Sequence, residues 1–535
     1  MERRGRKDNR IYWGLLALSL LFYLWLAAQI PYTHDDWDWG LPVGLEQLVT
    51  ASLNSRYAGN LTEVLLTRSP WLKTLVMGVV MAALPAAVTG LCCACDPEGA
   101  ARAPALRPLL LATANLLMLC THILIWQQAF GWVAGFSNFG LSSLLLCLYH
   151  WMLARFGRGE GLRGGPARLA LLFLFGAVIQ LYLENITVYV LLVSLGFLAW
   201  LLLKKRRVPG DFRALLAGNA LGTAVMFSSG IYSALISTGK AVGDYRQLTF
   251  DLHAPLYAIV WSLLKRFLLL YPASLWVAGW LPMLGVLLLL ALIARRRRPG
   301  LGLPIAITNG LLGLYILAMR LWGDFGRVLV FGVRANNLLS AFMGLAVFAA
   351  VTGELLLLWR GKRETMWMLL LLWLARPLVM APMAAVNTVD PRSYQTTEVL
   401  CWQLVLLLML QLRGLGPLGR RKLLMGALIL ALTLSVGRMA LVYTDIGSTK
   451  RLREDLIAQA RLEPQSALVL PKYRFADFLW LPDPVSPDNY RVDFFREFYR
   501  IPAETELWFE SWGEVPEALY AQLNPGQRSF LSQSP

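Results

Sequence analysis

The stretch that decides the fold is Ile11–Ile30, IYWGLLALSLLFYLWLAAQI, with the segment PYTHDDWDW that follows it at 31–39. The first part is long enough to span a bilayer. Basic residues precede it and no small-x-small cleavage site follows, so we expect a retained span with a cytoplasmic N-terminus rather than a signal peptide. Charged groups beside the hydrocarbon edge are costly unless they are hydrated, paired or used. The histidine and three aspartates at 34–38 are therefore the first candidates for a catalytic or binding role. The alternative is that they only form a hydrated polar rim at the membrane surface.

Composition indicates a polytopic membrane protein. Of the 535 residues, 57% are hydrophobic and only 16% are charged, and the mean hydropathy is +0.53. The formal net charge of +17 does not indicate nucleic-acid binding, because Lys and Arg collect in the cytoplasmic loops of membrane proteins. The six cysteines lie in or beside apolar runs, and the single C-x-x-C at Cys92–Cys95 is better explained as a helix end than as a metal or redox site.

Apolar runs predict an all-α protein with about thirteen transmembrane helices. The expected spans are 11–30, 71–94, 108–126, 139–153, 169–183, 186–203, 214–236, 272–294, 301–319, 338–359, 365–383, 399–412 and 423–443. This count places every large basic cluster on the N-terminal, cytoplasmic side, including 204–207 and 295–298. One missed span would invert all later clusters. For this reason we expect 254–270 to be an interfacial helix on the outer face rather than a span.

The outer loops carry unusual charges. The loop 31–70 is longer than most connections in helix bundles, which indicates a function. Loops 320–337 and 384–398 contain arginines, among them Arg327, Arg334 and Arg392, against the usual bias of short outer loops. Arginine suits multidentate capture of phosphate, so a phosphate or pyrophosphate at the outer membrane face is an expected ligand. Structural ion pairs with nearby acids are the alternative.

After Tyr443 no further span is expected. We divide the chain into a transmembrane domain at 1–444 and an extracytoplasmic C-terminal region at 445–535, which forms a small α/β or helical cap. Within this region, 450–461 is predicted as an amphipathic helix, 467–470 as a short strand and 490–499 as an aromatic-rich helix.

Several of these features resemble one family of enzymes. An acidic pair directly after the first span, in a long outer loop, is similar to the GT-C superfamily of membrane glycosyltransferases. More narrowly, the chain resembles a bacterial group related to GtrII-type glucosyltransferases, in motifs spread over nearly the whole sequence. These motifs are His34–Trp37, Asn54–Asn60, Glu184–Thr187, Arg334–Asn337 and Phe494–Tyr499.

The resemblance implies transfer of a sugar from a polyprenyl-phosphate-linked donor to an extracytoplasmic glycan, lipid or protein, with inversion at the anomeric carbon. It also implies a multi-pass bacterial cytoplasmic membrane protein. Asp35 and Asp36 are the candidate base, without a choice between them, because like charges this close raise one pKa toward neutrality. Glu184 is a second candidate acid, or else a helix cap.

The remaining expected site residues bind the substrates. Arg334 and Arg327 are the first choices for the donor phosphate, followed by Arg392 and Arg56. Expected substrate-binding residues are His34, Trp37, Tyr57, Asn60 and Asn337, although tryptophans here also serve as interfacial anchors. Some superfamily members use a divalent cation such as Mg²⁺ or Mn²⁺ and others do not, and no clear ligand set decides between them.

Two other functions fit the same pattern. A lipid-linked polysaccharide polymerase or ligase would also use outer arginines, but it does not need paired aspartates after the first span. A transporter or flippase of polyprenyl-linked sugars would place its ionisable residues near the bilayer midplane, often within inverted repeats. Here the charges lie at the ends of spans and no repeat is visible.

Overall fold

The first apolar run forms a helix, as its length and composition predict. The computed structural model describes residues 2–102, 106–162, 164–204, 206–241, 246–325, 333–387, 389–412, 418–463, 466–484 and 490–510. The α-helices are α1 (Glu2–Gln29), α2 (Asp36–Gly40), α3 (Pro42–Thr50), α4 (Tyr57–Thr67), α5 (Pro70–Cys95), α6 (Pro97–Arg102), α7 (Leu106–Leu119), α8 (Ile123–Ala129), α9 (Val133–Gly135), α10 (Leu141–Gly157), α11 (Ala167–Ile179), α12 (Glu184–Leu203), α13 (Gly210–Phe227), α14 (Gly230–Thr238), α15 (Leu256–Ala273), α16 (Trp280–Arg297), α17 (Pro299–Phe325), α18 (Val333–Leu358), α19 (Arg363–Met380), α20 (Gln395–Gln411), α21 (Leu418–Leu462) and α22 (Tyr490–Tyr499).

Short helices and strands complete the described chain. Two are π-helices, η1 (Phe136–Gly140) and η2 (Ser274–Ala278), and three are 3₁₀-helices, η3 (Ala381–Ala385), η4 (Pro391–Tyr394) and η5 (Ala476–Phe478). The strands are β1 (Lys240–Ala241), β2 (Arg246–Gln247), β3 (Ala467–Pro471) and β4 (Glu506–Glu510). Strands β1 and β2 pair antiparallel, whereas β3 and β4 pair parallel with Ala467 opposite Glu506.

The chain is a multi-pass, predominantly helical protein. Within the described ranges, nine helices are long and apolar enough to cross a membrane, or up to eleven if each of two bent pairs is one span. The bent pairs are α7 with α8, at 93°, and α13 with α14, at 63°. The expected count of thirteen is not confirmed. Helix α11 has 13 residues, about 20 Å of helix, which is shorter than the hydrocarbon core.

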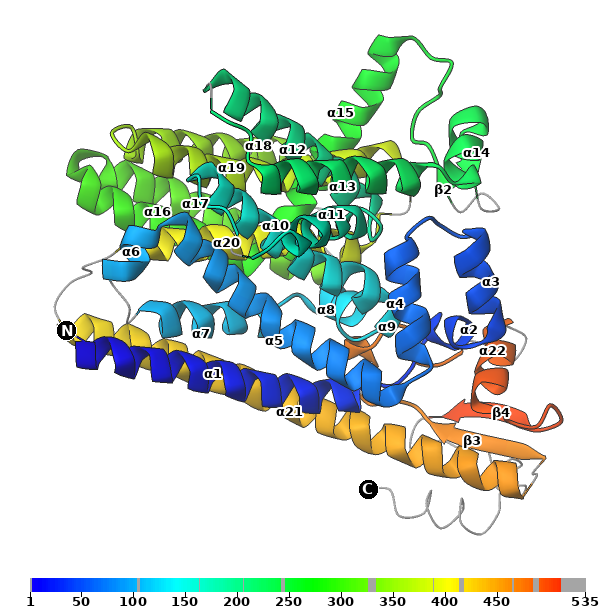
Figure 1. The fold of residues 1–535 in the computed structure, drawn as a ribbon. Helices are drawn as coiled ribbons and strands as arrows, with labels where there is room; N and C mark the ends of the chain where they lie inside the picture. The colour runs from blue at the N-terminus through cyan, green and yellow to red at the C-terminus, as the bar shows by residue number, and fades with distance from the viewer. Residues whose placement is uncertain are drawn as a thin grey trace.

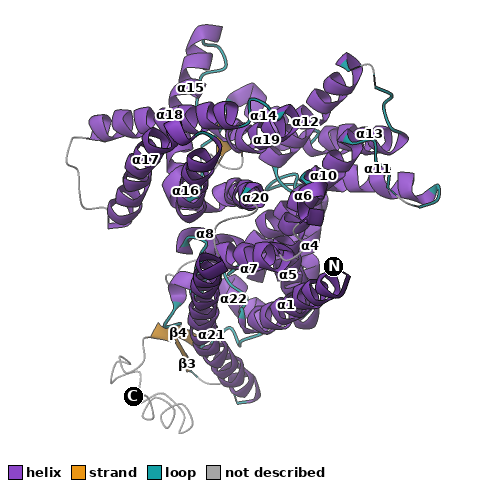
Figure 2. Ribbon diagram, turned by 90° about the vertical axis from the view of Figure 1, so that its left-hand side faces the viewer, coloured by secondary structure: helices purple, strands orange, loops and turns teal. Residues whose placement is uncertain are grey.

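The arrangement places one helix at the centre. Figure 2 shows α1, α5, α7 and α21 on one side and α15 to α19 on the other, with α20 between them. Helix α20 packs against α5 and α7 as well as against α16 and α19. Nearly all of its residues are buried, which explains why an apolar segment without a polar face lies inside the protein rather than at its edge.

The predicted boundary between two domains at 444/445 falls inside a single helix. Helix α21 continues for 45 residues, and runs beside α1 along one edge of the molecule (Figure 1). Its last turns lead to β3, β4 and α22, so the predicted strand at 467–470 and helix at 490–499 are confirmed. The C-terminal elements lie at the same end of the molecule as α2, α3 and α4 (Figure 1).

Two helices cross closely through glycines. Gly218 and Gly222 on α13 have the small-xxx-small spacing that lets helix backbones approach each other. A Cβ on Gly218 would overlap the Phe173 carbonyl of α11, and one on Gly222 would overlap the Ala177 carbonyl. Substitution of either glycine would therefore force the two helices apart.

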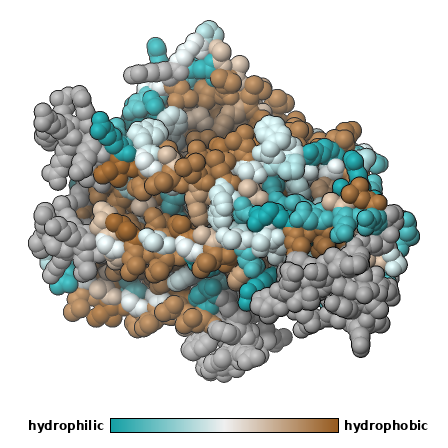
Figure 3. Space-filling model, turned by 90° about the horizontal axis from the view of Figure 1, so that it is seen from below, coloured by the Kyte–Doolittle hydropathy of each residue, from teal (hydrophilic) through white to brown (hydrophobic). Residues whose placement is uncertain are grey.

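The outer surface agrees with a membrane environment. Hydrophobic residues predominate on the face shown in Figure 3, and hydrophilic ones gather toward its right-hand end. Helix α15, expected to lie on the membrane surface, is long and apolar enough to cross a membrane together with η2. Its interfacial position therefore stays a prediction that depends on the placement of the arginine clusters.

Candidate functional site at the end of the first helix

The candidate site is built on the sharp turn that follows α1. Thr33 is fully buried, and His34 adopts a φ of +53°, in the left-handed region that non-glycine residues rarely occupy. The turn closes when the Asp36 backbone N–H donates to the Thr33 carbonyl at 3.0 Å. Helix α2 then starts at Asp36, so the acidic cluster begins within one residue of a strained turn.

Asp36 fixes this turn to a neighbouring helix. Its side chain is 0% exposed, and its two oxygens accept separate hydrogen bonds, from the Thr33 N–H at 2.8 Å and from the Ala134 N–H at 2.9 Å. Ala134 lies at the start of the helical segment Val133–Gly157, where the unpaired N–H groups and the helix dipole favour a carboxylate. Burial raises the pKa of Asp36 to about 7, although these backbone hydrogen bonds act to lower it. Asp36 is therefore an anchor with both oxygens occupied.

Asp35 has a different environment. Its side chain is 39% exposed, and its Oδ1 lies 2.5 Å from His34 Nδ1 and 3.6 Å from an Arg491 nitrogen of α22. Burial raises the pKa of Asp35 to about 6, and the positive charge of Arg392 opposes the rise. This carboxylate combines access to a ligand with a pKa close to neutrality, which is the combination a general base needs.

Two more carboxylates lie in the same cluster. Burial, with the charge of Asp35, raises the pKa of Asp38 to about 8. Glu63 of α4 is 1% exposed, and no described residue hydrogen-bonds to its Oε1. Burial raises the pKa of Glu63, and the charges of Asp36, Asp35 and Asp38 raise it further. This rise in pKa favours the uncharged form of Glu63, which limits repulsion within the cluster.

These acids do not form an evident metal centre. Among the described residues, no group of three or more His, Cys, Asp or Glu side chains is placed to hold a metal ion. We accordingly assign no metal ligand.

An aromatic wall borders the cluster. The His34 ring contacts Trp132 edge-to-face, with centroids 5.6 Å apart, and lies 6.1 Å from Trp480. The Arg392 guanidinium lies 5.3 Å from the centre of the Trp132 ring, and one of its nitrogens donates to Asp390 at 2.7 Å. The structure thus brings Arg392 and the first loop together, as expected. The Asp390 partner also fits the alternative of a structural ion pair.

Arg56 and Glu184 pair with each other. The Arg56 Nε donates to Glu184 Oε2 at 3.0 Å, and a second guanidinium nitrogen lies 2.8 Å from the same oxygen. Tyr232 of α14 donates to the other oxygen, Glu184 Oε1, at 3.1 Å. The predicted acid and the predicted phosphate ligand therefore pair with each other, which fits the alternative of a structural ion pair, and their roles in the reaction stay predictions.

Other predicted substrate-binding residues take part in packing. Trp37 is 1% exposed, its Nε1 donates to the Tyr32 carbonyl at 3.2 Å, and its ring meets Phe495 of α22 edge-to-face. The buried Asn60 donates to Asn54 Oδ1 at 3.0 Å. Neither side chain presents a free face to a sugar, so we reassign both to structural roles. Tyr57, at the start of α4, is half-buried.

Three predicted residues are not placed. Arg327 lies outside the described residues, and Arg334 and Asn337 belong to α18, where the described part does not include their side chains. Their assignment to the donor phosphate and to the substrate stays a prediction.

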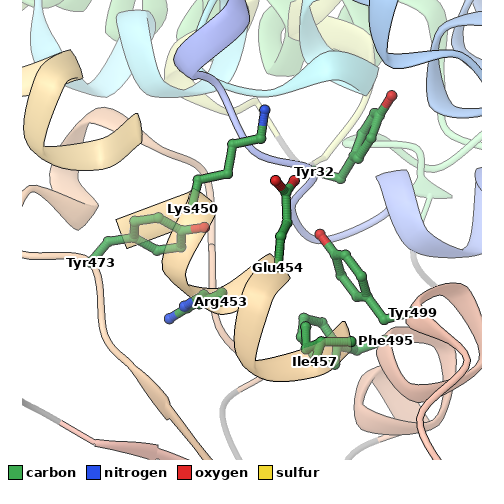
Figure 4. Close-up of a pocket in the computed structure, with 8 residues that line it drawn as sticks. All are labelled: Tyr32, Lys450, Arg453, Glu454, Ile457, Tyr473, Phe495 and Tyr499. Carbon is green, nitrogen blue, oxygen red and sulfur yellow. The ribbon is translucent and has the colours of Figure 1, made fainter. Parts of the chain in front are cut away.

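A small cavity lies beside the anchored turn. Figure 4 shows that Lys450, Arg453 and Glu454 of α21 line it together with Tyr32 and Tyr499. Its volume is about 10 Å³, which is enough for one water molecule. Arg453 already has partners in the protein, since its Nε donates to the Pro471 carbonyl at 2.7 Å and a terminal nitrogen donates to Asp483 at 2.5 Å. The cavity is therefore a small gap in side-chain packing and not a substrate site.

Sequence reasoning missed four members of the site: Glu63, Trp132, Trp480 and Arg491. For one of them, Glu63, the sequence contains a pattern that could have indicated it. Asn60, Glu63 and Thr67 recur at spacings of three and four in an otherwise apolar helix, which predicts a polar stripe turned toward the protein. The other three come from segments 90 or more positions further along the chain, and no local sequence pattern indicates that they lie next to the first loop.

No protein-family model, curated protein or solved structure matches this sequence. The function is therefore argued from the chemistry of the residues described above.

Proposed function

We propose that this protein is a membrane glycosyltransferase that moves a sugar from a polyprenyl-phosphate-linked donor to an extracytoplasmic acceptor glycan, lipid or protein. The observation that carries the proposal is Asp35, a partly exposed carboxylate with a pKa near 6, beside an imidazole and near two arginines at the end of a membrane helix. The resemblance to GT-C enzymes supports the same reaction.

Asp35 is the proposed general base. As the acceptor hydroxyl attacks the anomeric carbon, its proton passes to Asp35, and the bond from that carbon to the phosphate oxygen of the donor breaks. Attack from the face opposite the phosphate inverts the anomeric centre. Asp36 is not free to accept this proton in the same way, because both of its oxygens already accept backbone hydrogen bonds.

Positive charge is available for the leaving phosphate. Arg392 lies near Asp35, and Arg491 reaches it from α22. Cations placed in advance where negative charge develops stabilise a transition state without reorganisation. In this proposal Arg392 and Arg491 hold the departing polyprenyl phosphate, while Trp132 and Trp480 supply apolar surface for the sugar ring.

The proposal includes an orientation. The N-terminus is cytoplasmic, the turn at 31–39 and the C-terminal elements face outward, and the membrane is a bacterial cytoplasmic membrane. The basic clusters support this orientation, because the predicted spans place them all on the N-terminal side.

The test is a transfer assay with purified full-length protein in nanodiscs, supplied with a panel of polyprenyl-phosphate sugars and crude envelope acceptors. We expect one donor to be consumed, with activity lost in Asp35→Asn and retained in Arg297→Gln, an arginine change distant from the turn. Consumption of no donor would refute the proposal. Products longer than one sugar would identify the polymerase, and donor movement across the bilayer without product would identify the transporter.

A further inference from the structure

A second group of unusual polar residues lies away from the first loop, around Arg376 of α19. Arg376 is 0% exposed. One guanidinium nitrogen contacts Met283 Sδ at 3.0 Å, whereas Nε and the other terminal nitrogen have no hydrogen-bond partner among the residues that the structure describes. A guanidinium carries five N–H donors in a fixed plane, so most of its hydrogen-bonding capacity is unused here.

A second orphaned group lies nearby. The Tyr271 hydroxyl, at the end of α15, is buried and lies within electrostatic range of Arg376. In the described part of the chain it has no hydrogen-bond partner. Both groups are held in place by rings. Tyr271 packs edge-to-face on Phe348, Phe348 stacks on Trp373, and the guanidinium lies 5.3 Å from the centre of the Trp373 ring.

The backbone also makes room for the guanidinium. A Cβ at Gly279 would lie 3.2 Å from the free terminal nitrogen of Arg376. Gly279 directly follows the π-helix η2, and such π segments are frequent at functional sites because they break the regular backbone pattern. Elements α15, η2 and α19 thus meet at Arg376, an arginine with N–H groups that no acceptor in the described residues satisfies.

No acid neutralises Arg376 in the described part of the chain. Its guanidinium contacts Met283 and the Trp373 ring, and the carboxyl of Glu398 on α20 lies instead near Thr121 and Trp402. An unpaired buried cation is strongly unfavourable. Since the orphaned groups are donors, the missing partner is an acceptor with negative charge.

We infer that Arg376 and Tyr271 form a binding site for a phosphate-bearing anion, either a lipid phosphate or free phosphate. Two guanidinium N–H groups match two oxygens of a tetrahedral anion, and the tyrosine hydroxyl donates to a third. The inference does not depend on the proposed glycosyltransferase reaction, since it concerns binding alone.

The location connects the two sites. Helix η4, which carries Arg392, packs against both η2 and α8. The segment formed by η2 and Gly279, which approaches Arg376, therefore also contacts the helix that carries Arg392.

Binding can be measured without turnover. Full-length protein in detergent is titrated with inorganic phosphate by calorimetry, and protein in phosphatidylcholine nanodiscs is compared with nanodiscs that contain phosphatidic acid, by thermal unfolding. We expect at least one of these ligands to bind or to raise the unfolding midpoint. Response to the lipid alone identifies a lipid headgroup, and response to inorganic phosphate identifies a free anion.

Variants decide whether Arg376 is responsible. Arg376→Gln is expected to weaken binding by about 100-fold, because it removes a charge-assisted pair. Tyr271→Phe is expected to weaken it by about 10-fold, because it removes one hydrogen bond to a charged ligand while keeping the ring. Tyr271→Phe also keeps the test valid if Arg376→Gln does not fold.

The matched control is Arg297→Gln. Arg297 also stacks on a tryptophan, with its guanidinium 4.6 Å from the centre of the Trp359 ring, but it donates to Gln411 and therefore has a partner. Its substitution should leave binding unchanged. Equal binding by wild type, Arg376→Gln and Tyr271→Phe would overturn the inference, as would the absence of any response to both ligands in wild type.

Discussion

The Arg56 guanidinium and the Glu184 carboxylate form an ion pair, with a terminal guanidinium nitrogen 2.8 Å from Glu184 Oε2. The pair joins the first loop to the start of α12 across 128 positions of sequence. Each side chain is only about one-fifth exposed. The pair therefore helps to hold α4, and with it Glu63, against the rest of the helices.

A double-mutant cycle should measure this pair. We expect Arg56→Gln and Glu184→Gln each to lower the free energy of unfolding, with a coupling of about 1 kcal/mol, because both variants remove the same partly buried contact. Chemical unfolding in detergent gives the four values of the cycle. A coupling near zero would show that the two residues act independently.

Asp35 and Asp36 should differ in what their substitution changes. Asp36→Asn leaves one amide oxygen for two backbone N–H donors, so we expect a loss of about 1–3 kcal/mol in the free energy of unfolding. Asp35→Asn should leave stability nearly unchanged and abolish sugar transfer. Unfolding curves and transfer rates are measured on both variants, with Asp38→Asn as the neighbouring control that keeps activity. Loss of activity in Asp38→Asn alone would move the base to that residue.

The proposed base should give the activity a characteristic pH dependence. Asp35 must be deprotonated to accept a proton, and its pKa is raised to about 6. We therefore expect kcat/KM to rise tenfold per pH unit below about 6 and to level off above it. Rates between pH 4.5 and 8 test this. A profile that is flat across this range would exclude a base with this pKa.

Asp36 should make stability fall as pH rises. Its pKa is about 7 in the folded protein, against an ordinary value of 3.8. Between these values the folded state keeps a proton that the unfolded state releases, so stability is fully present below about pH 4 and is lost as the pH rises to 7. The contribution is about 1.4 kcal/mol per pH unit.

The difference between wild type and Asp36→Asn isolates this contribution from the other raised acids. Unfolding midpoints in detergent at pH 5, 6 and 7 should fall less steeply in the variant. Parallel curves would show that Asp36 is already ionised at pH 5.

Phe495 should hold the C-terminal elements to the first loop. It is 2% exposed and meets both Trp37 and Phe509 edge-to-face. Phe495→Ala is expected to cost about 3–5 kcal/mol and to release α22 from α2. Limited proteolysis of the C-terminal region reports the release. Phe342→Ala, at a site 68% exposed, is the matched control and should leave cleavage unchanged.

Local patterns predicted much of the fold. The first span, the strand at 467–470 and the helix at 490–499 follow from apolar length and periodicity. The count of spans did not follow, because α11 is too short to cross a membrane alone and α7 and α8 are separated by a bend. A hydropathy average over a long window does not detect such breaks, so it counts the segments as full spans. The predicted boundary at 444/445 marks the end of the apolar part of α21, and the helix continues beyond it with a polar sequence. The division into two domains stays a prediction.

The candidate site was predicted in position but not in detail. The turn at 34–38 was found because charge beside a membrane span is locally conspicuous. That Asp36 is buried and Asp35 accessible depends on Ala134 and on Arg491, which approach from distant segments. The pairing of Arg56 with Glu184 was missed because two charges in separate loops give no sign of their distance.

The sequence by itself determined that this is a multi-pass helical protein with an acidic turn after its first helix, since apolar length and the proximity of charges are properties of contiguous residues. Only the tertiary structure decided which aspartate is partly exposed, which arginines are already paired, and that two nitrogens of Arg376 have no hydrogen-bond partner within the described residues. Those outcomes depend on how helices far apart in sequence pack, and burial, hydrogen bonding and pKa are set by that packing.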